Sequence, residues 1–133
     1  MRFADTSFWV ALALRKDGHH KEAKALWDER DERVLSTNHV VGELWTFLRR
    51  RDGHAAARQA HSLLVSSTSV ELIHVSEDVE EDAWGWLERH DERSYSFVDA
   101  TSFAVMRRRG LLEAMAFDGD FSAAGFIEVR QRG

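Results

Sequence analysis

Short apolar segments alternate with longer amphipathic segments along nearly the whole chain. The apolar segments have the length of strands and the amphipathic segments the length of helices, so the alternation predicts an α/β fold with a mostly parallel sheet. In open sheets of this kind, ligands bind beyond the carboxyl ends of the strands. The expected strands are Arg2–Asp5, Val34–Ser36, Val70–Val75, Ala114–Phe117 and, at a sheet edge, Ile127–Val129.

Residues that favour helix ends mark the helices between these strands. Asn38, Ser76 and Ser96 can each accept a hydrogen bond from the first turn of a helix, and Gly53 and Gly110 can end one. The helices therefore fill most of the sequence between the strands. They are expected to start near Thr6 or Ser7 and to cover His20–Asp31, Asn38–Arg51, Ala55–Val65, Ser76–His90 and Ser96–Arg109.

Length and composition limit the class of protein. A chain of 133 residues forms one domain, expected over 1–133, and its 44% hydrophobic and 31% charged residues exclude disorder. Because there is no cysteine, disulfide scaffolds, zinc-thiolate sites and cysteine nucleophiles are excluded. The longest apolar run, Phe8–Leu14, is too short to span a bilayer and no basic leader precedes it, so we expect a soluble cytoplasmic protein.

Acidic residues lie where the predicted topology places ligand sites. Asp5 ends the first strand, Asp118 follows the fourth, and Asp120 comes two residues later. Glu43 and Asp99 lie on helices that start shortly after a strand or loop. Because parallel strands end at the same sheet edge, we expect these carboxylates to gather there.

Asp99 has the most unusual surroundings of these acids. It shares a helix face with Phe103 and Met106, and only the last residues of that helix are strongly polar. A buried carboxylate needs a hydrogen-bonding partner or a cation, because loss of hydration destabilises its charge. The structural alternative is a capping box, in which the Asp99 carboxylate accepts a hydrogen bond from the Ser96 amide.

The other acids also have structural alternatives. Glu43 can form a surface ion pair with Arg50, and His39, four residues before Glu43, has the spacing of a metal ligand. Asp5 and Asp120 can cap the helices that follow them. A shared site is favoured, because otherwise several separate explanations must hold for carboxylates that all face one sheet edge.

The charge of the chain favours a cation at this edge. The formal net charge is −5, and Asp5, Glu43, Asp99 and Asp118 account for four of those charges. Such a cluster repels itself unless it is neutralised, and an all-oxygen set favours Mg²⁺ or Mn²⁺. These ions activate water and neutralise phosphoryl groups, so the sequence predicts phosphodiester hydrolysis.

Motifs of other phosphate-handling and hydrolytic classes are missing. The sequence has neither a Gly-x-Ser-x-Gly elbow nor a Gly-x-x-x-x-Gly-Lys loop. A receiver-type phosphoacceptor needs a late lysine, and no lysine follows Lys24; a haloacid-type phosphatase needs its Asp-x-Asp after the first strand. The arginine clusters Arg49–Arg51 and Arg107–Arg109 end two helices, where cations suit the helix dipole, and are candidates for contacts with the phosphates of a nucleic acid.

Four short segments, taken in order, form a specific set: Phe3-Ala4-Asp5-Thr6-Ser7, Asn38-His39-Val40-Val41-Gly42-Glu43, Ser96-Phe97-Val98-Asp99-Ala100 and Ala116-Phe117-Asp118-Gly119-Asp120-Phe121. Together they resemble the PIN-domain ribonucleases, and specifically the VapC toxins of bacterial toxin–antitoxin systems. The resemblance covers essentially the whole chain and implies a PIN-like three-layer sandwich. The stretch from Tyr95 to Phe126 is most similar to the VapC branch that cleaves the sarcin–ricin loop of 23S rRNA.

The resemblance also implies a site and partners. Asp5, Glu43, Asp99 and Asp118 would form a Mg²⁺ site, with Asp5 and Asp99 as the surest ligands, while the role of Asp120 stays open. The substrate would be RNA, specifically rRNA, and the partners a second copy of the chain and a VapB-type antitoxin. A non-toxin RNA-processing nuclease and a catalytically silent module that binds RNA or partners remain alternatives.

Overall fold

Five short parallel strands form one sheet in the order β3-β2-β1-β4-β5. This computed structural model describes residues 1–131, so the last two residues of the predicted domain 1–133 lie outside the described part. The predicted parallel sheet and the edge position of the last strand are confirmed. The strands are β1 (Arg2–Ala4), β2 (Val34–Thr37), β3 (Val70–Ile73), β4 (Glu113–Met115) and β5 (Ile127–Glu128).

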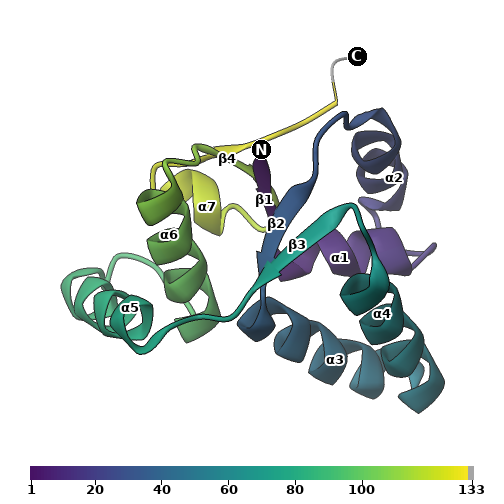
Figure 1. The fold of residues 1–133 in the computed structure, drawn as a ribbon, viewed down its shortest axis with the longest axis horizontal. Coiled ribbons are helices and arrows are strands. Elements are labelled where there is room, and N and C mark those ends of the chain that lie inside the picture. The colour runs from purple at the N-terminus through teal and green to yellow at the C-terminus, as the bar shows by residue number, and fades with distance from the viewer. Residues whose placement is uncertain (132–133) are drawn as a thin grey trace.

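Seven helices flank the sheet within the described residues, and they give the predicted helix–sheet–helix layers (Figure 1). The first four helices along the chain lie on one side of the sheet and the last three on the other. The helices are α1 (Thr6–Ala13), α2 (His20–Glu29), α3 (Asn38–Asp52), α4 (His54–Ser66), α5 (Glu77–Arg89), α6 (Phe97–Arg109) and α7 (Asp120–Ala123).

The structure corrects one predicted cap and several strand ends. β1 and β5 end one residue earlier than predicted, and β4 covers Glu113–Met115 rather than Ala114–Phe117. Thr37, not Asn38, is the N-cap of α3, and its hydroxyl accepts a hydrogen bond from the Val40 amide. Asn38 instead accepts a hydrogen bond from the Val75 amide at 2.8 Å through Oδ1. β3 ends at Ile73 rather than at the predicted Val75, because its partner strand β2 ends at Thr37, opposite Ile73, and passes into α3.

The apolar run Phe8–Leu14 supplies core residues. Phe8 and Trp9 are buried, as are most residues of the central helix α6. On α5 Trp86 is buried, whereas Trp84 is exposed and stacks on Phe97, with ring centroids 4.2 Å apart. The core therefore lies between the sheet and its helices and fixes the strand ends where the acids emerge.

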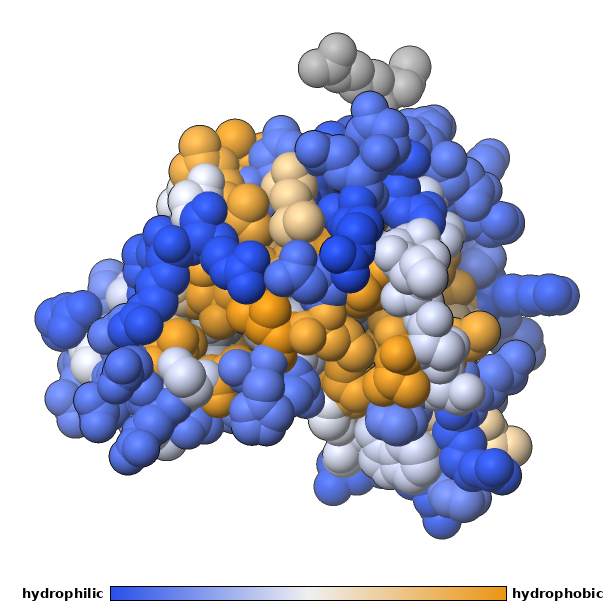
Figure 2. Space-filling model, viewed as in Figure 1, coloured by the Kyte–Doolittle hydropathy of each residue, from blue (hydrophilic) through white to orange (hydrophobic). Residues whose placement is uncertain are grey.

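Apolar side chains also reach the surface. Figure 2 shows a band of them across the middle of the face on which β3 lies in front. β3 is an edge strand of the sheet and lies beside a cavity of about 550 Å³ lined by residues such as Trp45, Val65, Leu72 and Ile73. Within residues 1–131, no helix combines the length and the apolar character needed to cross a membrane.

Candidate active site

Asp5 leaves β1 at its carboxyl end and caps α1. Its Oδ2 accepts hydrogen bonds from the Ser7 amide at 3.2 Å and from the Ser7 hydroxyl at 2.9 Å. Its Oδ1 is buried and has no hydrogen-bonding partner among the described residues. The predicted capping role of Asp5 is confirmed, yet it uses only one carboxylate oxygen and leaves the other available for a cation.

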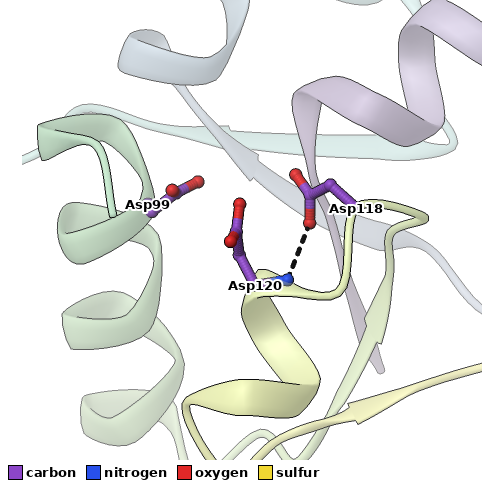
Figure 3. A group of neighbouring side chains, drawn as sticks. All are labelled: Asp99, Asp118 and Asp120. Carbon is purple, nitrogen blue, oxygen red and sulfur yellow. Dashed lines mark hydrogen bonds between the residues drawn. The ribbon is translucent and has the colours of Figure 1, made fainter. Parts of the chain in front are cut away.

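Asp99, like Asp5, uses one carboxylate oxygen to cap a helix and leaves the other available for a cation. Its Oδ2 accepts a hydrogen bond from the Ser96 amide at 2.9 Å, and the Ser96 hydroxyl accepts one from the Asp99 amide at 2.9 Å. The capping box considered from the sequence is therefore present. Asp99 is only 7% exposed, and its carboxylate points toward Asp118 and Asp120 (Figure 3).

Asp118 and Asp120 lie in the turn between β4 and α7. Gly119 between them has a φ of 82°, which favours glycine, and the Asp120 amide donates a hydrogen bond to Asp118 Oδ1 at 3.1 Å. One oxygen each from Asp99, Asp118 and Asp120 lies within 4.8 Å of the others. This spacing allows the three carboxylates to share one cation.

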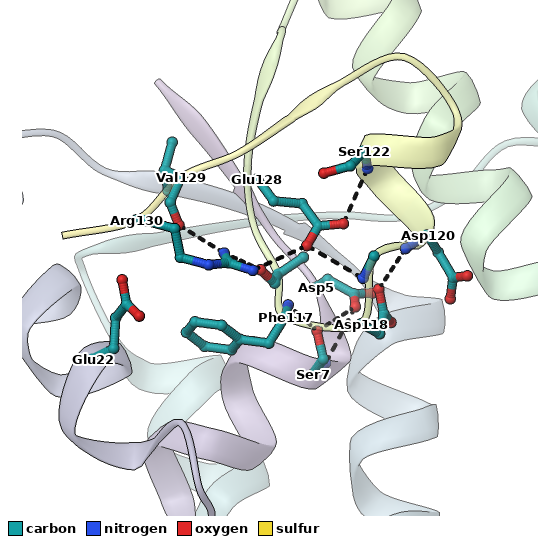
Figure 4. Close-up of polar contacts among 12 residues, drawn as sticks. Asp5, Ser7, Glu22, Phe117, Asp118, Asp120, Ser122, Glu128, Val129 and Arg130 are labelled. Carbon is teal, nitrogen blue, oxygen red and sulfur yellow. Dashed lines mark hydrogen bonds and ion pairs between the residues drawn. The ribbon is translucent and has the colours of Figure 1, made fainter.

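The turn that carries these two acids is held from both sides. Glu128 accepts hydrogen bonds from the Gly119 amide at 3.3 Å and the Ser122 amide at 3.0 Å (Figure 4). Arg93 donates a hydrogen bond to the Asp118 carbonyl oxygen at 3.0 Å. The carboxylates are thus fixed by contacts made before any ligand binds.

The electrostatic surroundings favour a bound cation. Loss of hydration, followed by the nearby charge of Asp118, holds the pKa of Asp5 well above its ordinary value. Loss of hydration also raises the pKa of Asp99 to about 6, and the charges of Asp120 and Asp118 add to that shift. The pKa of Asp118 is raised chiefly by loss of hydration and further by Asp120.

Glu43 lines the same cavity as Asp5 and Asp118 but is not one of the three clustered carboxylates. The cavity has a volume of about 350 Å³. Among the described residues Glu43 forms no ion pair, so the pairing with Arg50 considered from the sequence is absent. His39 pairs with Glu80, with Nε2 and Oε2 3.3 Å apart, so it is engaged outside the acidic cluster.

The structure thus brings the four predicted residues around one edge of the sheet, together with Asp120, whose role the sequence left open. Sequence reasoning missed the supporting residues Ser7, Arg93 and Glu128. Only Ser7 carried a signal, because a serine two residues after an aspartate commonly bonds back to that carboxylate.

The arginine cluster Arg107–Arg109 lies at the carboxyl end of α6, whereas Asp99 lies in its first turn. Arg108 pairs with Asp82 and Arg109 with Glu71, at the end of α6 opposite Asp99. Nine residues of helix separate Asp99 from Arg108, a rise of about 14 Å. The cluster Arg107–Arg109 therefore lies away from the acidic cluster.

Comparisons with known proteins agree with this geometry. A model of the PIN domain matches residues 2–127. The "23S rRNA-specific endonuclease VapC20" of Mycobacterium tuberculosis, from strains CDC 1551 / Oshkosh and H37Rv, is 59% identical over 130 residues, which cover 98% of this chain and 98% of the relative.

Solved structures show the same likeness. The crystal structure of M. tuberculosis VapC20, described as a sarcin–ricin loop cleaving toxin, has a TM-score of 0.95 and 57% identity, covering 98% of this chain and all of that one. A toxin–antitoxin complex from Klebsiella pneumoniae shares the fold, with a TM-score of 0.60 and 17% identity over 86% of this chain and 83% of that one. The family match spans almost the entire sequence, and the chain therefore belongs to the PIN-domain family.

Proposed function

We propose that this chain is a metal-dependent endoribonuclease that hydrolyses a phosphodiester bond in the sarcin–ricin loop of 23S rRNA. The observation that carries this function is the gathering of four acids at one sheet edge: Asp5 and Asp99 are buried, Asp120 is half-buried and Asp118 is exposed. The substrate follows from the 59% identity to a 23S rRNA-specific endonuclease. We further propose that the single PIN domain extends over 1–133 and acts in the cytoplasm.

The residues at this edge fit a hard divalent ion, Mg²⁺ or Mn²⁺. All the available donors are carboxylate oxygens, and Asp5 Oδ1 is buried without a partner among the described residues. Asp5, Asp99 and Asp118 would hold the ion with help from Glu43. Asp120 joins them because one of its oxygens lies within 4.8 Å of oxygens of Asp99 and Asp118. When bound, such an ion supplies positive charge at the phosphoryl group and a water of lowered pKa.

The chain's own side chains would then orient the reaction. Glu43 on the cavity wall, or Asp118 at its rim, accepts a hydrogen bond from the attacking water and aligns it with the phosphorus atom. Ser7 keeps Asp5 in place by donating its hydroxyl hydrogen to the carboxylate. In-line attack by water leaves a 5′-phosphate and a 3′-hydroxyl end.

Incubation of the purified protein with intact ribosomes and Mg²⁺, followed by mapping of new RNA ends, tests this function. We expect one new 5′-phosphate end in the sarcin–ricin loop with the wild type. Asp5→Asn and Asp99→Asn should abolish the cut, whereas Asp91→Asn, an exposed site without an assigned contact, should keep it. Cleavage that persists in both active-site variants, or a 2′,3′-cyclic phosphate product, would overturn the proposal.

We also propose that the protein is the toxin of a toxin–antitoxin pair, with a VapB-type antitoxin as its partner. The support is the likeness to VapC20, whose crystal structure is described as that of a toxin. Expression of the chain alone should arrest growth, and coexpression of the antitoxin should relieve the arrest. Growth that continues while the wild-type protein accumulates in active form would instead favour a non-toxin RNA-processing nuclease.

A homodimer is the oligomeric state that we propose. The free edge of β3 and the apolar cavity beside it offer a surface for a second copy, and Val65 on this surface is 54% exposed. Light scattering coupled to size exclusion should give twice the mass of the chain for the wild type and a larger monomer fraction for Val65→Lys. A wild-type mass equal to one chain would contradict this state.

A further inference from the structure

We infer that the acidic cavity also holds a nucleobase, that of the nucleotide beside the scissile phosphate, against a platform formed by His19 and Phe117. This inference rests on the proposed RNA cleavage and extends it to substrate recognition. His19 and Phe117 line the cavity together with Asp5, Glu43 and Asp118. An aromatic surface and the hydrolytic acids therefore face the same space.

The two rings of the platform lie flat against each other. Their centroids are 4.5 Å apart and their planes are inclined by only 3°. Phe117 covers one face of the imidazole, and His19 as a whole remains exposed. The second face of the imidazole is consequently open for another flat group to stack on it.

Hydrogen bonds of the backbone amides hold the main chain at both residues, and the stacking of the two rings restrains their side chains. The Phe117 amide donates a hydrogen bond to the Ser7 hydroxyl at 3.0 Å, and Ser7 in turn binds Asp5. The His19 amide donates to Asp17 Oδ1 at 2.8 Å. An exposed side chain that is fixed in this way loses little conformational entropy when a ligand stacks on it.

A third aromatic ring completes the lining. Phe47 of α3 faces the cavity and is 38% exposed, and the Arg51 guanidinium lies 5.9 Å from its ring centroid. The volume of about 350 Å³ falls within the range of roughly 300–1,000 Å³ typical of small-molecule sites. The cavity thus combines flat apolar walls with carboxylates, as a site for a base joined to a reacting phosphate requires.

Of the parts of an RNA chain, a base fits this platform better than the phosphate backbone does. Proteins recognise looped RNA by stacking its unpaired bases on aromatic side chains, histidine included. Carboxylates repel the phosphate backbone unless a cation intervenes, whereas the uncharged π-face of a base suits His19 and Phe117. Because every base has such a face, the platform positions the nucleotide without strong preference for its identity.

The test compares His19→Ala with His19→Phe on a hairpin RNA that contains the cleaved loop. Loss of one base–aromatic stack corresponds to about a 5- to 150-fold effect. We expect kcat/KM to fall within that range for His19→Ala and to stay near the wild-type value for His19→Phe, which keeps a flat ring. His54→Ala, which removes an exposed histidine on α4, is the matched control and should have no effect.

An abasic nucleotide on either side of the cut identifies the base. At one of the two positions, the abasic nucleotide should lower kcat/KM of the wild type as much as His19→Ala does. The kcat/KM of His19→Ala on that abasic RNA should be no lower than with either change alone. If the losses from the abasic nucleotide and from His19→Ala multiply, or if the wild type and His19→Ala cleave the RNA equally well, the proposed base stacking is wrong. The proposed hydrolysis would remain intact.

A binding readout separates the two proposals. With 2-aminopurine placed at each nucleotide of the loop in turn, stopped-flow fluorescence should show quenching by the wild type at one position before the first turnover, and none at that position by His19→Ala. If the wild type fails to cut RNA, the proposed function fails, and this quenching still tests the platform. Equal quenching by both proteins would overturn the platform in either case.

Discussion

Arg93 donates a hydrogen bond from Nε to Oδ1 of Asp120 at 2.6 Å, across 27 positions of sequence. Asp120 is one of the three carboxylates that lie close enough to share a cation. Arg93 therefore already supplies part of the positive charge that the cluster needs. Its contact with the Asp118 carbonyl oxygen also fixes the turn between the two acids.

Replacement of Arg93 should strengthen metal binding. Arg93→Gln removes a positive charge beside the cluster, so we expect the Mg²⁺ dissociation constant to fall by about two- to tenfold. Isothermal titration calorimetry measures it, with the exposed Arg89→Gln as a control for loss of charge elsewhere. Unchanged or weaker Mg²⁺ binding would show that Arg93 acts only by positioning the turn.

The stability of the metal-free protein should fall with rising pH because of Asp99. Its pKa of about 6 in the folded state lies above the ordinary value of 3.8, so the folded protein holds this proton more tightly than the unfolded chain. The destabilisation is absent below about pH 4, grows between pH 4 and 6, and is complete above pH 6. Asp99→Asn removes it and keeps an oxygen for the Ser96 amide.

Melting curves in EDTA measure this effect. We expect Asp99→Asn to melt a few degrees above the wild type at pH 7.5, and the difference to shrink at pH 4. Added Mg²⁺ should raise the melting temperature of the wild type more than that of the variant. The same difference at both pH values would disprove the assigned titration.

Asp5 has two roles that two substitutions can separate. Asp5→Asn keeps a side-chain oxygen for the Ser7 amide, so it should fold normally while losing at least about 100-fold in cleavage rate. Asp5→Ala also removes the cap and should lower the free energy of unfolding by about 0.5–2 kcal/mol relative to Asp5→Asn. Urea denaturation and a cleavage assay test both, and wild-type activity in Asp5→Asn would exclude Asp5 from the site.

Ser7 links the two strand ends of the site. Its hydroxyl donates to Asp5 and accepts from the Phe117 amide, so Ser7→Ala leaves both partners without that bond. We expect a loss of about 1–3 kcal/mol in the free energy of unfolding, measured by urea denaturation. Ser122→Ala, at an exposed hydroxyl in α7, is the control, and an equally small change in both would contradict the linking role.

Local patterns explain why most of the fold was predictable. Ser76 and Ser96 cap α5 and α6 as expected, because capping depends on residues within one helical turn. Asn38 was assigned a cap that Thr37 provides, since the partner of Asn38 is the Val75 amide, 37 positions away. Errors of this kind arise where a distant hydrogen bond replaces a local one.

The sequence by itself determined the alternation of strands and helices and placed Asp5, Glu43, Asp99 and Asp118 near one sheet edge, because strand and helix periodicities and capping are encoded locally. Only the tertiary structure decided that Asp120 lies close enough to Asp99 and Asp118 to share a cation with them, while Glu43 lines the adjoining cavity. It also decided that Arg93 binds Asp120. The physical reason is that the distances between these charges depend on how α6 and the turn after β4 pack together, and no short stretch of sequence contains that information.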